Sequence, residues 1–152
     1  MIVISENPFD PWQALQDYQT SAAMQGQYGA TTVFVGTMRD FNDGDTVKSM
    51  TLEHYPGMTE KHLTNIISDA KQRWAIIASL VVHRVGDIYP DQPIVLVAVW
   101  AAHRGDACDA CRFIIEALKS NAPFWKKEHL SSDQSRWVTH NSKGYLNTKV
   151  SD

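Results

Sequence analysis

Two lysines follow a Pro-Phe-Trp step in the last third of the chain. In the stretch "PFWKKE", Lys126 and Lys127 come directly after Trp125. A proline stops a helix, and aromatic side chains can anchor a turn on apolar surface, so we expect this turn to direct Lys126 toward the core. A lysine held there can act as a base or attack a carbonyl carbon when it is neutral, and can stabilise an oxyanion when it is charged.

Other cationic side chains follow predicted strands. Arg39 comes after "VFVGTM", His83 and Arg84 come after "SLVV", and His103 and Arg104 come after "VLVAVWAA". The end of a strand is held rigidly by the sheet and is still accessible, so it carries binding groups well. Each residue alone is more often simply solvated. Together with the lysines, they supply enough donors to hold a small molecule that carries a phosphate.

Lys119 lies in the last turn of a predicted helix. A cation there interacts favourably with the helix dipole, by about 0.3–1 kcal/mol, which explains the residue without any chemistry. Cys108 lies earlier on the same helix, roughly 16 Å away along the helix axis. The thiol of Cys108 therefore cannot serve chemistry at Lys119.

Cys108 and Cys111 form a C-x-x-C pattern, which is typical of a redox dithiol or of half a zinc site. No second C-x-x-C or H-x3-5-H pattern completes a four-ligand zinc site. Asp106 and Asp109 flank the pair and disfavour the thiolate that redox chemistry needs. We interpret both cysteines as small apolar residues on a packed helix, and a dithiol oxidoreductase is the alternative.

The elements that must position these residues are a mixture of strands and helices. Asp10 and Pro11 form a helix start, Gly26 is expected to close that helix, and Pro123 ends the last one. The predicted strands cover 1–5, 30–38, 47–55, 75–84, 93–103 and 136–138, and the predicted helices cover 11–26, 56–74 and 106–120. The strict βαβ alternation of a doubly wound fold is missing, as are G-x-G-x-x-G and Walker loops. We therefore expect an α+β domain with a mainly antiparallel sheet.

Length and composition exclude several classes of protein. The 152 residues fit one domain, which we place at 1–140 with a flexible tail at 141–152. A net charge of −3 argues against a general nucleic-acid binder. No apolar run reaches the roughly 18 residues that cross a bilayer, and the N-terminus does not resemble a secretory signal. We expect a cytoplasmic protein that binds neither membrane nor nucleic acid.

Several motifs, in order from about residue 30 to 138, resemble the family of the large, catalytic subunit of molybdopterin synthase. The most specific are V-G-x-x-R before an N-x-G turn, E-x-Y after it, A-H-R before the third helix, and P-x-W-K-K-E. A following "RWV" extends the match. Any one motif can arise by chance, whereas the ordered set is hard to reach otherwise.

The resemblance implies an α/β hammerhead-type fold and a homodimer. The homodimer pairs with a small ubiquitin-like sulfur carrier, to give a heterotetramer, and the carrier ends in Gly-Gly bearing a thiocarboxylate. The implied activity is that of a sulfurtransferase in molybdenum cofactor biosynthesis. It transfers two sulfurs to cyclic pyranopterin monophosphate and forms the dithiolene of molybdopterin, with no metal or cofactor of its own.

The resemblance also assigns roles to residues of this chain. Lys119 and Lys126 are the implied catalytic residues. The implied substrate-binding residues are Thr37, Met38, Arg39, His103, Arg104, Lys119, Lys126, Lys127 and Glu128. A module that binds a ubiquitin-like tail without catalysis is the alternative.

Overall fold

The computed structural model describes residues 1–121 and 123–139. The expected tail at 141–152 lies outside the described residues, and a single domain over 1–140 stays a prediction. No helix in the described part of the chain is both long enough and apolar enough to cross a bilayer.

A four-stranded sheet forms the body of the molecule. Its strands, in spatial order, are β1 (Ile2–Ser5), β5 (Ile76–Arg84), β7 (Pro93–Ala101) and β2 (Ala30–Thr37). β1 pairs with β5 in parallel, whereas the β5–β7 and β7–β2 pairs are antiparallel. The central strands β5 and β7 are almost continuously apolar because both of their faces are covered.

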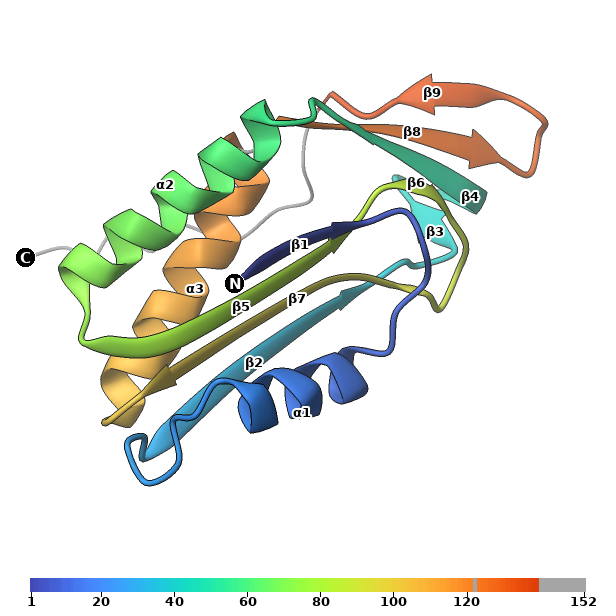
Figure 1. The fold of residues 1–152 in the computed structure, drawn as a ribbon. Coiled ribbons are helices and arrows are strands. Elements are labelled where there is room, and N and C mark those ends of the chain that lie inside the picture. Colours follow the sequence, from blue (N-terminus) through green and yellow to red (C-terminus); the bar gives the residue numbers. More distant parts are fainter. Residues whose placement is uncertain (122, 140–152) are drawn as a thin grey trace, which may run out of the picture.

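Helices cover the two faces of this sheet. α2 (Met58–Arg73) and α3 (Arg104–Asn121) pack on one face, and α1 (Pro11–Ser21) packs on the other (Figure 1). Successive strand residues point to opposite faces, so Val81 packs with α2 and α3 while Leu80 packs with the α1 side. The two cores share only the sheet between them.

A second sheet, of five strands, extends from one end of the body (Figure 1). It contains β3 (Phe41–Asn42), β4 (Asp45–His54), β8 (Phe124–Leu130) and β9 (Ser135–Trp137) in that order, and β6 (Gly86–Ile88) also pairs with β4. All of these pairs are antiparallel. The expected α+β, hammerhead-type domain with a mainly antiparallel sheet is confirmed.

Two element predictions were wrong. The first helix ends at Ser21 and not at Gly26, because Ala22 caps it and Ala23 turns to a φ of 48°, which leaves the helix. The stretch after Pro123 is strand β8 and not a turn, because it pairs with β4 over most of its length. This pairing supplies hydrogen-bond partners that the local sequence does not reveal.

Candidate functional site

A cavity of about 440 Å³ is lined by residues of both sheets and of the C-terminal end of α3. We call it the lysine cavity, because Lys119 and Lys126 both line it. The other residues of the implied site that line it are Thr37, Met38, Arg39 and Glu128. Segments far apart in sequence therefore bring six of the nine implied site residues to one place.

Strand geometry aims Lys126 into this cavity. Alternate residues of β8 face opposite sides of the sheet, so Phe124, Lys126 and Glu128 line the cavity. Lys127 faces the other side, where its Nζ lies 5.7 Å from the ring centroid of Trp137. The expected direction of Lys126 is thus correct, but strand alternation causes it and not a turn.

Glu128, on the side of β8 that faces the cavity, is buried, with an exposed fraction of 3%. Its Oε1 accepts a hydrogen bond from Asn42 Nδ2 at 2.8 Å and lies 3.7 Å from Lys126 Nζ. Its Oε2 accepts from Arg136 Nε at 3.0 Å. Both oxygens therefore already have protein partners. Asn42 and Arg136 were not among the residues predicted for the site, although both lie in the motifs that carried the resemblance.

Backbone hydrogen bonds fix the residues that follow β2 and line another side of the cavity. Met38 N–H donates to the Gln92 carbonyl at 3.0 Å, and the Met38 carbonyl accepts from Asp91 N–H at 3.0 Å. Arg39 follows on the exposed rim, with its guanidinium carbon 4.8 Å from the centroid of the Phe41 ring. This cation–π contact leaves a cation beside the cavity.

His83 and Arg84 do not supply the cations that we expected from them. His83 lines the lysine cavity, but burial lowers its pKa to about 4, so the ring is neutral near pH 7. Arg84 is 2% exposed, does not line the cavity, and donates from Nη2 to the Asp87 carbonyl at 2.8 Å. The cations of the cavity are therefore Arg39, Lys119 and Lys126.

The fold of one chain keeps His103 and Arg104 away from the lysine cavity. Arg104 is the first residue of α3, and Lys119 lies in its last turn. A separation of fifteen residues corresponds to about 22 Å along a helix axis. His103 and Arg104 thus lie at the opposite end of α3 from the lysines.

The two cysteines differ in their environments. Cys111 is buried, its thiol lies 3.8 Å from the Val97 carbonyl oxygen, and burial raises its pKa to about 12. Cys108 is exposed, and its sulfur lies 3.4 Å from Thr32 Oγ1. The packing interpretation is confirmed for Cys111 and wrong for Cys108. Within residues 1–121 and 123–139, no group of three His, Cys, Asp or Glu side chains could hold a metal ion.

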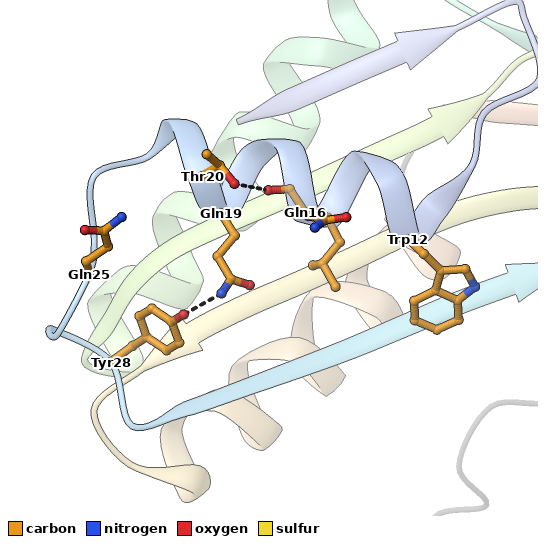
Figure 2. A pocket seen from close by; sticks show the side chains of 7 residues that line it. Trp12, Gln16, Gln19, Thr20, Gln25 and Tyr28 are labelled. Atoms are coloured by element: carbon orange, nitrogen blue, oxygen red, sulfur yellow. Dashed lines mark hydrogen bonds between the residues drawn. The ribbon is translucent and has the colours of Figure 1, made fainter.

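A second cavity, of about 380 Å³, lies beside α1 and differs in chemistry (Figure 2). Its lining residues are Trp12, Leu15, Gln16, Gln19, Thr20, Gln25 and Tyr28. None of these carries a charge near neutral pH. The view shows Gln19 donating to the Tyr28 hydroxyl, at 2.6 Å. An anionic ligand therefore fits the lysine cavity and not this one.

Comparison with known proteins gives one family and several relatives. The family model described as "MoaE protein" matches residues 4–121. The chain is 58% identical, over 112 residues, to a molybdopterin synthase catalytic subunit of Ralstonia nicotianae, a match that covers 74% of this chain and 63% of that protein. It is 47% identical, over 137 residues, to the protein of the same name from Pseudomonas aeruginosa, a match that covers 90% of this chain and 89% of that protein.

Solved structures share the fold. A molybdopterin synthase structure from Staphylococcus aureus matches with a TM-score of 0.78 at 33% identity, covering 91% of this chain and 96% of that one. A structure from Helicobacter pylori, titled as a complex of subunits 1 and 2 of molybdopterin-converting factor, matches with a TM-score of 0.76 at 23% identity. That match covers 93% of this chain and 92% of the other. At 23% identity, it shows only that the two chains share a fold.

Proposed function

The chain belongs to the MoaE protein family, and from this premise we propose that it is the catalytic subunit of a molybdopterin synthase. As a sulfurtransferase, it passes sulfur from the C-terminal thiocarboxylate of a small ubiquitin-like carrier to cyclic pyranopterin monophosphate, to give the dithiolene of molybdopterin. The convergence of Lys119 and Lys126 in one cavity, with Arg39 beside them, carries this proposal.

The charges of the cavity suit both reactants. The phosphate of the pterin and the thiocarboxylate of the carrier are anions, and Arg39 can make two parallel hydrogen bonds to such a group. Sulfur leaves the carrier when water adds to the carbonyl carbon that bears it and the C–S bond breaks, so the carrier ends as an ordinary carboxylate. One lysine, as an ammonium group, stabilises the negative charge that develops on the carbonyl oxygen in this step, and the other takes the proton from the water. Glu128 acts on the substrate only through Lys126, because its own oxygens are occupied by Asn42 and Arg136.

His103 and Arg104 enter the proposed site from a second copy of the chain. Arg104 occupies the first position of α3, where a cation opposes the helix dipole, so the stability of the helix does not explain it. We place both residues at the lysine cavity of the partner in a homodimer, where they bind the phosphate or the pterin. With one carrier at each cavity, the assembly is a heterotetramer.

A reconstituted reaction tests the proposed function. The chain is mixed with a thiocarboxylated carrier and cyclic pyranopterin monophosphate, and dithiolene product is measured in a single turnover. Lys119→Ala should lower the rate by about 10²- to 10⁴-fold, as expected for a positioned acid–base group. Lys61→Ala, on the exposed side of α2, is the matched control and should turn over normally. If the carrier binds and no product forms with the wild type, the non-catalytic binding module takes the place of the enzyme.

A further inference from the structure

His83 is a buried ring among the residues that line the lysine cavity. It is the last residue but one of β5, directly before Arg84, and is 5% exposed. Its ring stacks on Phe124, with centroids 4.0 Å apart and planes inclined by 11°. Because Phe124 begins β8, this stacking fixes the strand two residues before Lys126.

A single hydrogen bond determines which ring nitrogen of His83 carries the hydrogen. Nδ1 lies 2.8 Å from the Arg84 carbonyl oxygen. A carbonyl oxygen only accepts, so Nδ1 donates. Burial, with a smaller contribution from nearby His54, lowers the pKa of the ring to about 4, against the opposing effect of the Arg84 hydrogen bond. In the neutral ring, Nε2 is therefore a lone-pair acceptor.

This acceptor is available to whatever occupies the cavity. Within residues 1–121 and 123–139, no group donates a hydrogen bond to Nε2. His83 lines the cavity, and Nε2 is not among the fully buried, unpartnered side-chain nitrogens of the described chain, which belong to Arg84 and Trp100. An acceptor in a confined site is stabilised by a ligand that donates to it.

We propose that His83 determines specificity in the lysine cavity by accepting, at Nε2, a hydrogen bond from an N–H or O–H group of the pterin. This rests on the proposed function. Arg39, Lys119 and Lys126 can only donate, and Glu128 is occupied, so they hold the anionic end of a ligand. The acceptor selects a ligand that also carries a neutral donor, such as a nitrogen heterocycle, over a bare phosphate.

Two substitutions of His83 distinguish the contribution of its hydrogen-bond acceptor from that of its packing against Phe124. His83→Phe keeps a flat ring against Phe124 and removes the lone pair, whereas His83→Gln offers an amide oxygen as acceptor. Dissociation constants for cyclic pyranopterin monophosphate and for inorganic phosphate are measured by calorimetry on the full chain. His83→Phe should weaken pterin binding by about 3- to 10-fold, the loss of one neutral hydrogen bond. Phosphate binding should be unchanged, and His83→Gln should recover part of the pterin affinity.

His54→Phe is the matched control, because His54 pairs with Phe124 across β4 and β8 but does not line the cavity. It should bind the pterin as the wild type does. Wild-type pterin affinity in His83→Phe, or an equal loss of pterin and phosphate, overturns the role of His83 and leaves the proposed function standing. A wild type that binds phosphate but not the pterin overturns both. If His83→Phe does not fold, His83→Leu and His83→Gln give the same comparison of acceptor absent and acceptor present.

Discussion

Glu128 forms an ion pair with Lys126 and accepts hydrogen bonds from Asn42 and Arg136. A buried carboxylate with donors on both oxygens has a fixed position. Lys126 Nζ lies 3.7 Å from Oε1 of this carboxylate, which is held in place by a hydrogen bond to each oxygen. At the level of single residues, the position of Lys126 depends on a carboxylate that Asn42 and Arg136 already hold.

Glu128→Gln should lower the rate of sulfur transfer by about 10- to 100-fold, because a small misplacement of Lys126 moves it out of productive geometry. Dithiolene formation under single-turnover conditions measures this effect. Asp45→Asn is the control, since Asp45 also pairs with Arg136, at 2.7 Å, but has no contact with Lys126. If both variants lose rate equally, Glu128 acts through the stability of the sheet and not through Lys126.

The buried His83 should make the protein sensitive to acid. The unfolded chain binds a proton at this residue near pH 6.5, and the folded chain only near pH 4. Acidification therefore favours the unfolded state, and the free energy of unfolding falls by on the order of 3 kcal/mol between these two pH values, with no further loss from this group below pH 4. Urea denaturation at a series of pH values should show a smaller decline for His83→Phe. Parallel declines would mean that His83 is protonated equally well in both states.

At the level of secondary structure, the alternation of side chains along β8 places its two lysines on opposite faces of the sheet. Lys126 pairs with Leu52 and faces the cavity, whereas Lys127 pairs with Thr51 and Trp137 and faces outward. A one-residue shift in register would exchange their positions. The pairing of β8 with β4 is therefore part of the proposed active site.

Lys126→Ala should lower the rate of sulfur transfer by about 10²- to 10⁴-fold, and Lys127→Ala should lower it far less. Melting temperatures should change little in either variant, since exposed or half-exposed lysines usually contribute within about 0.5 kcal/mol to stability. Single-turnover rates with saturating carrier make the comparison. A larger loss in Lys127→Ala would show that Lys127, and not Lys126, is the lysine that acts on the substrate.

α1 contributes stability on the face of the sheet away from α3. Asp10 Oδ1 accepts hydrogen bonds from Trp12 N–H and Gln13 N–H, at 2.8 and 3.1 Å. Asp10→Ala should lower the free energy of unfolding by about 1 kcal/mol in urea denaturation, the usual contribution of an N-cap. Asp17→Ala, on the exposed surface of the same helix, should cost clearly less. Sulfur transfer below the melting temperature should be unaffected by either change.

At the scale of the whole molecule, one chain brings Lys119 and Arg39 together and separates both from Arg104. The lysine cavity forms where the two sheets meet the end of α3, and Arg104 begins that helix. In the proposed homodimer, each complete site draws on both chains. The number of intact sites in a mixed dimer therefore depends on which chain carries which substitution.

Mixing Lys119→Ala chains with Arg104→Ala chains, after unfolding and refolding together, should restore sulfur transfer that neither variant has alone. Each mixed dimer then contains one cavity with an intact lysine from one chain and an intact arginine from the other. Turnover of the mixture is compared with that of each variant refolded alone. No recovery in a mixture that contains mixed dimers would mean that each site belongs to one chain.

Features that depend on local pattern could be read directly from the order of the amino acids. Leu63, Ile66 and Ile67 recur at helical spacing in the sequence, and all three lie in the core. Asp10 before Pro11 predicted the start of α1. The ordered motifs predicted the family. Such features follow from neighbours within one or two turns, or from residue identities, and both can be read along the chain.

Which distant segments meet could not be read from the sequence and is seen only in the folded chain. "FWKKEHL" has no strong strand pattern, and it is a strand because β4, seventy or more residues earlier, supplies its hydrogen bonds. The same pairing places Lys126 beside Glu128 and stacks Phe124 on the ring of His83. The length of α3 separates Arg104 from the lysine cavity. Burial then made His83 neutral, which its position after a strand did not reveal. Long-range pairing and desolvation depend on the complete packed chain, and no local pattern encodes them.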